Sequence, residues 1–305
     1  TYNGARYIEE QLQSFADQTL KPDELVISDD GSTDATLDIV RDFARRAPFD
    51  VRVERNPDNL GYAKNFGKAM ALCSGDIIFL SDQDDVWLPE KLERIRSEFI
   101  ARPDIHLIIN DTRIVDGDLR DTGLTKLGQT RSLGLGDRAF LTGCCSALRA
   151  EFRDIVLPVP ACIFVHDTWL HALGDSLAVR LVVDTPLQLY RRHETNASAA
   201  LQSATTRLGP EDLFQAYSGG DSRAYAKRAV EEIDMLRDRL KAVRGKSGDL
   251  LDHHFDPALM RLDAWESAAR ARLGLLARRR IARIVPASAM YLRGQYAYFS
   301  GWRSF

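Results

Sequence analysis

The sequence is poor in cysteine, and its few cysteines do not stand at metal-binding spacing. The 305 residues contain four, at Cys73, Cys144, Cys145 and Cys162, and no two of them form a C-x-x-C pair. A zinc site or a dithiol redox motif is therefore not expected. Reduced thiols packed in the core, as in a cytoplasmic protein, are the expected state.

Two other features are missing. No apolar run approaches the roughly 20 residues that a membrane-spanning helix needs. No G-x-G-x-x-G motif follows a predicted strand, which disfavours a dinucleotide-dependent oxidoreductase. The composition is otherwise ordinary for a globular protein, with 45% hydrophobic residues, 28% charged residues and a net charge of −3. This length predicts one large domain with an appendage, or two domains. Separately, no nucleic acid is expected among the partners.

Acidic residues are absent from the C-terminal end. Residues 267–305 contain eight arginines and no Asp or Glu, and apolar residues alternate with the charges in "RARLGLLARRRIARIVP". A basic amphipathic segment suits an anionic lipid surface or a protein partner, and this predicts peripheral contact with the inner face of the cytoplasmic membrane. A solvated helix face explains the same pattern equally well.

Over its first two thirds the sequence alternates strand-like and helix-like segments. Helical spacing of apolar residues alternates with short apolar runs that end in polar turns. This β-α-β order predicts an α/β fold with a mainly parallel sheet and helices on both faces, in which ligands bind at the carboxyl ends of the strands. The predicted helices cover about residues 8–15, 35–46, 62–72 and 89–100, and the predicted strands 24–29, 51–54, 76–81 and 105–110.

The predicted α/β domain covers residues 1–202, and a helical C-terminal region covers residues 203–305. The opening "TYNGARY" is typical of the loop that follows a strand, so we expect the first strand of the sheet to lie upstream of Thr1. Beyond residue 203, one helical stripe that ends at Gly245 contains Ala226, Ala229, Val230, Ile233, Leu236 and Leu240.

Three carboxylates are crowded directly after an apolar run in "FLSDQDDVWLPEKL". Asp82, Asp84 and Asp85 occupy four consecutive positions, and such like charges repel unless a cation or water separates them. One interpretation is a solvated turn before a helix that starts near Pro89. The other is a divalent cation that carries a phosphorylated ligand, because Mg²⁺ and Mn²⁺ prefer oxygen ligands of this kind.

Two more loops follow predicted strands. In "SDDGSTD", Asp29 and Asp30 reach the ligand edge of the sheet, where a carboxylate can accept the imide N–H of a base or a ribose hydroxyl. In "NLGYAKNFG", Gly61 allows close backbone approach, and Lys64 can reach a diphosphate. A plain β-to-α turn with a helix cap accounts for the first loop except for its two aspartates.

Two further motifs lie near the end of the predicted sheet domain, "FVHDTWL" around Asp167 and "YRRHETNAS" around His193. The ordered set "TYNGARYIEEQLQSFADQT", "SDDGSTD", "NLGYAKNFG", "SDQDDVW", "HDTW" and "YRRH" resembles the family 2 glycosyltransferases, which have the GT-A fold. The resemblance covers about residues 1–198. The forms "SDQDDVW" and "YRRHETNAS" are most similar to the bacterial rhamnosyltransferase branch.

The resemblance implies roles for the acidic loops. Asp29 or Asp30 would contact the nucleotide base. Asp82 and Asp84 would form the D-x-D pair, with Asp82 near the ribose and Asp84 on a Mn²⁺ or Mg²⁺ ion. The role of Asp85 stays open, as an outer-shell residue or a residue of the helix start.

The resemblance also implies roles for the two later motifs. Asp167 matches the catalytic base of the family, although His166 stands where many members have Glu. An N-cap role for Asp167 is compatible with this. His193 matches a histidine that completes the metal site, and Arg191 or Lys64 would stabilise the leaving diphosphate.

The implied activity is an inverting, metal-dependent glycosyltransferase. It would use dTDP-rhamnose or a UDP-sugar and a saccharide or lipid-linked acceptor in bacterial surface polysaccharide synthesis (O-antigen, lipopolysaccharide or capsule). A nucleotidyltransferase that makes the sugar nucleotide would share the sheet but needs a Gly-rich basic loop, and "NGARYIEEQ" is neither. A non-catalytic nucleotide-sugar-binding protein is the other alternative.

Overall fold

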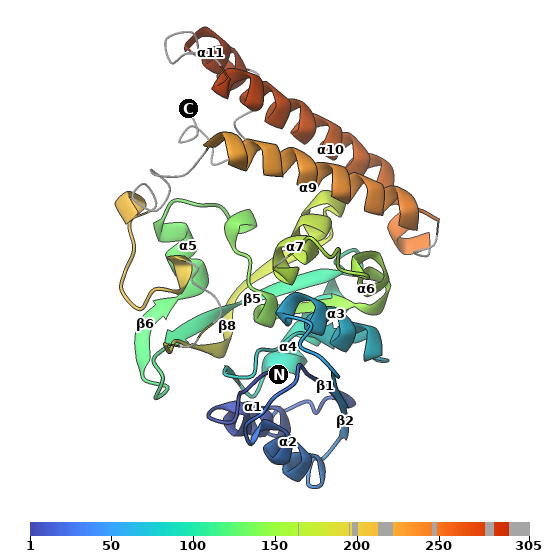
Figure 1. The fold of residues 1–305 in the computed structure, drawn as a ribbon, viewed down its shortest axis with the longest axis vertical. Helices are drawn as coiled ribbons and strands as arrows, with labels where there is room; N and C mark the ends of the chain where they lie inside the picture. The colour runs from blue at the N-terminus through green and yellow to red at the C-terminus, as the bar shows by residue number, and fades with distance from the viewer. Residues whose placement is uncertain are drawn as a thin grey trace. The chain divides into compact units, whose positions relative to one another are not determined.

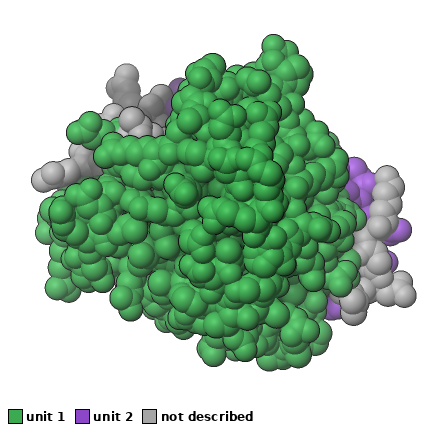
Figure 2. Space-filling model, turned by 90° about the horizontal axis from the view of Figure 1, so that it is seen from below, with its two compact units in different colours: residues 1–175, 179–213 green, residues 176–178, 214–305 purple. Residues whose placement is uncertain are grey.

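The computed structural model describes residues 1–163, 165–194, 196, 201–212, 222–245, 249–277 and 284–292. The chain divides into two compact units, which Figure 2 colours separately. The first unit is α/β and comprises residues 1–175 and 179–213, and the second is helical and comprises residues 176–178 and 214–305.

The first unit begins with a two-stranded parallel sheet and two helices (Figure 1). The elements are α1 (Ile8–Ala16), β1 (Glu24–Asp29), α2 (Thr36–Ala44) and β2 (Asp50–Arg55). Apolar residues one helical turn apart, such as Ile8 and Leu12 on α1 and Val40 on α2, pack with Ile27 of β1 in one buried cluster. Burial of this stripe explains why the sequence folds locally as predicted.

A six-stranded sheet forms the centre of the first unit. In the order β3-β7-β5-β8-β4, with β6 paired to β5, the strands are β3 (Ile77–Phe79), β7 (Ser146–Arg149), β5 (Leu107–Val115), β8 (Arg180–Arg191), β4 (Val86–Trp87) and β6 (Asp121–Thr125). The expected α/β architecture is confirmed, but the pairing is mixed. The pairs β1–β2 and β5–β8 are parallel, while β3–β7, β4–β8, β5–β6 and β5–β7 are antiparallel. The expectation of a mainly parallel sheet is therefore wrong for the central sheet, because the short strands β3, β4, β6 and β7 each pair antiparallel to a neighbour.

Helices cover both faces of this sheet. On one face, Ile95 and Phe99 of α4 (Lys91–Ala101) pack with Ile108 of β5. On the other face, Leu127 of α5 (Lys126–Ser132) packs with Ile109 of β5. Neighbouring residues of β5 thus point to opposite faces, as the period of a strand requires. The remaining helical elements of this unit are α3 (Tyr62–Leu72), α6 (Ala150–Val156) and α7 (His166–Leu177), with short 3₁₀ turns η1 (Asp137–Ala139), η2 (Gly143–Cys145) and η3 (Leu201–Ser203).

The N-terminal segment connects the ends of β1 and β3. Thr1 donates to the carbonyl of Ser28 at 2.7 Å and accepts the backbone N–H of Asp30 at 2.8 Å. The backbone of Tyr2 exchanges two hydrogen bonds with the side-chain amide of Gln83, at 2.9 and 3.0 Å. The loops after the two strands are therefore linked through the N-terminal segment, although β1 and β3 belong to separate sheets.

The second unit contains the helices α9 (Ser222–Val243), α10 (Asp249–Leu276) and α11 (Ile284–Leu292). Helices α9 and α10 lie side by side (Figure 1), and all six residues of the predicted apolar stripe on α9 are buried. No helix in the described part of the chain combines the length and apolarity needed to cross a bilayer. Of the predicted basic segment, residues 278–283 and 293–305 lie outside the described residues.

Candidate active site

The first acidic loop is held together by Asp29. Its side chain is fully buried, and Ser32 donates its backbone N–H to Oδ2 at 3.0 Å and its hydroxyl to Oδ1 at 2.5 Å. The hydroxyl of Thr1 donates to Oδ1 at 3.1 Å. Asp29 thus fixes the turn that joins β1 to α2.

Asp30 shapes the neighbouring loop in a similar way. Its carboxylate accepts the backbone N–H groups of Leu60 at 2.8 Å and Gly61 at 3.0 Å, and the side-chain amide of Asn56 at 2.8 Å. Gly61 has a φ of +79°, a conformation that favours glycine, and α3 begins at the next residue. Lys64 lies exposed in the first turn of that helix. The predicted base contact of Asp29 or Asp30 stays a prediction, and both carboxylates already order the loops that would surround a nucleotide.

The structure brings the two ends of the predicted metal site together. His193 Nε2 lies 2.9 Å from Asp84 Oδ2, and the side-chain amide of Asn196 donates to the same oxygen at 3.2 Å. The ring of Tyr7 lies against His193, with 4.7 Å between the ring centres. The segment after β8 therefore packs its polar side chains onto the D-x-D loop.

Arg191 has a different environment from the one predicted for a diphosphate ligand. Its side chain is 2% exposed, and its guanidinium donates to the carbonyls of Asp84 at 2.8 Å and Gly117 at 2.7 Å. It also pairs with Glu10 of α1 and lies over the Tyr7 ring. These contacts support the backbone of the D-x-D loop, and donor binding by Arg191 stays untested.

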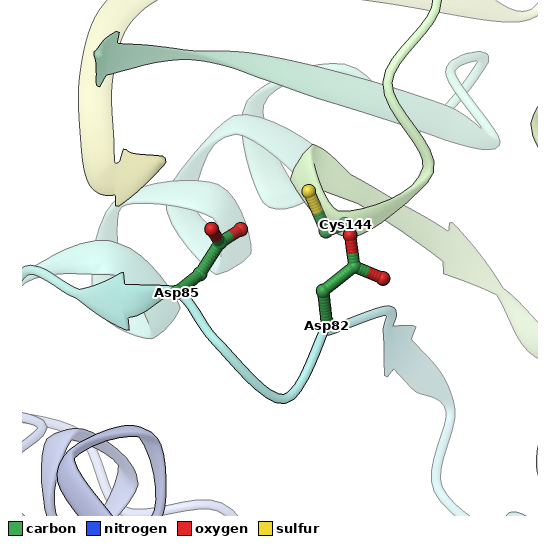
Figure 3. A group of neighbouring side chains, drawn as sticks. All are labelled: Asp82, Asp85 and Cys144. Carbon is green, nitrogen blue, oxygen red and sulfur yellow. The ribbon is translucent and has the colours of Figure 1, made fainter. Parts of the chain in front are cut away.

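The other two carboxylates of the loop form a cluster with a thiol (Figure 3). One carboxylate oxygen each of Asp82 and Asp85 and the Sγ of Cys144 lie within 4.8 Å of one another. Burial, followed by the charge of Asp84, raises the pKa of Asp82 to about 7 and that of Asp85 well above its ordinary value. The cluster thus carries an electrostatic penalty that a cation would relieve.

The available ligand atoms fit a hard divalent cation. Carboxylate oxygens at one loop, with an imidazole nitrogen from His193, are ligands that Mn²⁺ accepts, and Mg²⁺ binds through one or two carboxylates with ligand phosphates. The Cys144 thiol adds little to such a site, because its hydrogen bond with Cys145 and its burial raise its pKa well above the ordinary value. Asp84 and His193, which the structure brings into contact, are the residues that would hold the ion.

Asp167 lies in the first turn of α7. Its Oδ2 accepts the backbone N–H of Gly143 at 3.2 Å, while its Oδ1 is buried and has no hydrogen-bond partner within the described ranges. The neighbouring His166 stacks on Phe66, with 4.1 Å between the ring centres. Burial lowers the pKa of His166 to about 4, so the ring beside Asp167 is neutral near pH 7.

The turn η2 connects Asp167 with the cluster of Asp82, Asp85 and Cys144. Gly143 binds Asp167, and the next residue, Cys144, belongs to the cluster with Asp82 and Asp85. A β-carbon on Gly143 would lie 2.6 Å from His166 Nε2, so glycine is required for this approach. The sequence motifs alone did not identify this connection.

Sequence reasoning also missed Lys91, Lys126 and Gln188, which are buried beside the cluster. A weak signal was present for Lys91, since it stands one helical turn before Ile95 on the apolar face of α4. Charged residues at a helix start are otherwise expected in solvent.

Residues 1–156 match the model of the family described as glycosyl transferase family 2. The dTDP-rhamnosyl transferase RfbG of Shigella flexneri is 28% identical over 231 residues, which cover 68% of this chain and 77% of the relative. The uncharacterized protein Rv1520 of Mycobacterium tuberculosis is 29% identical over 204 residues, which cover 63% of this chain and 57% of the relative. The chain thus spans little more than half the length of that relative.

Solved structures show the same fold at low identity. S. aureus TarS 1–349, solved in complex with UDP-GlcNAc, is 19% identical with a TM-score of 0.51, and the match covers 88% of this chain and 89% of TarS 1–349. At this identity the likeness establishes the GT-A type of fold alone.

Proposed function

Because this chain belongs to glycosyl transferase family 2, we propose that it transfers a sugar from a nucleotide-diphosphate donor, with inversion and with a divalent metal. The donor is dTDP-rhamnose or a UDP-sugar, and the acceptor is a saccharide or lipid-linked saccharide of a bacterial surface polysaccharide. The similarity to a dTDP-rhamnosyl transferase supports the rhamnose donor. On this proposal the enzyme works in the cytoplasm, with its basic C-terminal segment available for peripheral membrane contact.

One observation carries the proposal. The D-x-D loop contacts the segment after β8 through His193 and Asp84, at 2.9 Å, and contacts η2 through the cluster with Cys144. Gly143 of η2 in turn donates to Asp167 in the first turn of α7, at 3.2 Å. This series of contacts supports a single site that combines the proposed metal ligands with a carboxylate that has one unpartnered oxygen within the described residues.

The transfer itself needs two changes of bonding. The bond between the anomeric carbon and the diphosphate oxygen breaks, and a bond from the acceptor oxygen to that carbon forms on the opposite face. The Asp167 carboxylate accepts the proton of the acceptor hydroxyl, and the electron pair of the broken bond leaves on the diphosphate. A single displacement of this kind inverts the anomeric configuration.

The residues around the donor have separate tasks. When bound, a divalent cation held by Asp84 and His193 would neutralise the charge that the diphosphate gains. Lys64 adds a positive charge in the first turn of α3, where the helix dipole also favours anions. Asp82 holds the ribose, and Asp29 and Asp30 form the base side of the site through the loops that they order.

A donor screen tests the proposal. The purified protein is heated with dTDP-rhamnose and common UDP-sugars, each with and without Mn²⁺ or Mg²⁺, and we expect one donor to raise the unfolding midpoint in the presence of the metal. Absence of any donor effect, together with release of pyrophosphate from a nucleoside triphosphate and a sugar 1-phosphate, would identify a nucleotidyltransferase instead.

A further inference from the structure

Two lysines are buried beside the acidic cluster. The side chain of Lys91 is 0% exposed and that of Lys126 is 4% exposed, although lysine is almost never buried without a partner. Lys91 Nζ lies 3.9 Å from the centre of the Trp87 ring, and Lys126 Nζ lies 4.1 Å from the centre of the Tyr190 ring. The two charges therefore occupy similar aromatic surroundings, and their polar contacts distinguish them.

Lys91 is joined to Asp85 by a hydrogen-bonded relay. Its ammonium donates to Oε1 of Gln188, and Nε2 of Gln188 donates to Oδ2 of Asp85 at 2.9 Å. An ammonium can only donate and a carboxylate accepts. The positions of these two groups therefore fix the orientation of the Gln188 amide, which transmits the position of one charge to the other.

Lys91 also contacts η2, the turn that contributes Cys144 to the cluster. Its Nζ donates to the backbone carbonyl of Cys144 at 3.4 Å, and the Cys144 thiol lies beside Asp82 and Asp85 (Figure 3). The other oxygen of Asp85 accepts the backbone N–H of Arg191 at 3.2 Å. Lys91 thus holds η2 directly, and through Gln188 it holds the acidic loop against the end of β8.

We infer that Lys91 is a positioning residue that orients Asp85 and η2 beneath the D-x-D loop through Gln188. It is a buried cation that is hydrogen-bonded into the crowded acidic loop through Gln188. This role also assigns Asp85, which serves as an anchor of the loop. The inference concerns how the acidic loop and η2 are held, so it can be tested separately from sugar transfer.

A double-mutant cycle tests the relay. Lys91→Met leaves the carboxylate of Asp85 without its hydrogen-bonded cation, and adding Asp85→Asn removes the charge of that carboxylate. We expect Lys91→Met to lower the thermal unfolding midpoint, and the double variant to unfold roughly 4 °C or more above Lys91→Met alone. Strictly additive effects would overturn the inference. If Lys91→Met does not fold, recovery of folded protein in the double variant supports the relay, and failure to recover it contradicts the relay.

Lys126→Met is the matched control, because it removes the same buried charge without a described hydrogen bond to Gln188 or Cys144. Lys126 is coupled to Asp85 by charge alone, so its cycle with Asp85→Asn should depart from additivity less than the cycle of Lys91→Met. As a second measurement, Mn²⁺ alone is titrated while the unfolding midpoint is followed. Compared with the wild-type chain, Lys91→Met should need an Mn²⁺ concentration at least roughly tenfold higher for half-maximal stabilisation. Lys126→Met should not need this increase. If the wild-type chain shows no response to Mn²⁺, the metal proposal fails, and the cycle still decides the role of Lys91.

Discussion

His193 Nε2 lies 2.9 Å from Asp84 Oδ2, although 109 residues separate the two along the chain. The contact joins the end of β8 to the loop after β3, and Asn196 donates to the same carboxylate oxygen. An imidazole and a carboxylate in this arrangement can turn together toward a cation, or hold one another when the cation is absent. This pair is the geometric basis of the proposed metal site.

Replacement of His193 should weaken metal binding. We expect His193→Ala to raise the Mn²⁺ concentration needed for donor binding by roughly 10- to 100-fold, because a ligand and its hydrogen bond to Asp84 are lost together. Donor titrations at several Mn²⁺ concentrations measure this. The matched control is His253→Ala, whose side chain is exposed on α10, and an equal effect of both variants would argue against a metal role for His193.

Replacement of Asp167 should affect turnover and spare donor binding. Asp167→Asn keeps the size of the side chain and removes the base, so we expect turnover to fall by roughly 10²–10⁴-fold. Product formation and donor affinity are measured on the same preparation. Asp154→Asn, on the exposed surface of α6, serves as the control. Normal turnover in Asp167→Asn would exclude Asp167 as the base.

Gly143 is predicted to tolerate no side chain. In Gly143→Ala the new β-carbon would lie 2.6 Å from His166 Nε2 and 3.4 Å from Asp167 Cβ. We expect the free energy of unfolding to fall by about 1–3 kcal/mol through overpacking, with a loss of turnover as Asp167 moves. Denaturant unfolding measures the first effect. Gly136→Ala is the control, since a β-carbon there meets open space, and a similar loss in both variants would refute this reading of Gly143.

The buried neutral His166 predicts an acid-sensitive fold. Its pKa is lowered from an ordinary 6.5 to about 4 by burial, so the unfolded chain gains the proton first as the pH falls. The contribution of neutral His166 to the free energy of unfolding is therefore fully present above about pH 6.5 and is lost as the pH falls toward 4. Between pH 7 and pH 5 this loss amounts to about 2 kcal/mol.

Urea unfolding at the two pH values measures this loss in the wild-type chain and in His166→Gln. Between pH 7 and pH 5, His166→Gln should lose about 2 kcal/mol less of its free energy of unfolding than the wild-type chain. An unchanged difference between the two pH values would show that His166 does not carry the effect.

The sequence predicted the parts of the site that depend on local pattern. Helix α3 spans Tyr62–Leu72 as expected, because Gly61 directly precedes its first residue as the N-cap and the apolar residues keep helical spacing along it. The acidic loops after β1 and β3 are also linked, through the contacts of Thr1 with Ser28 and of Tyr2 with Gln83, as their positions after successive strands suggested. The helix depends on neighbours in the chain, and the placement of the loops follows from the order of strands and helices.

The partners of buried charges could not be predicted. Arg191 is held by Gly117 and Glu10, and Lys91 by Gln188 and Cys144, all of them distant in sequence. A motif gives the residue type but leaves open whether a charge faces a ligand or the protein. For Arg191 the tertiary contacts favour a supporting role, which the motif alone could not distinguish from donor binding.

Donor binding by Asp84→Asn is the most direct test of the proposed metal-dependent donor site. Calorimetry with dTDP-rhamnose and UDP-GlcNAc is performed with Mn²⁺ and after chelation of the metal. In the wild-type chain we predict that chelation weakens binding of the true donor at least roughly tenfold, and that Asp84→Asn with Mn²⁺ behaves like the chelated wild type. Equal affinity and turnover of both chains, unaffected by chelation, would contradict the account.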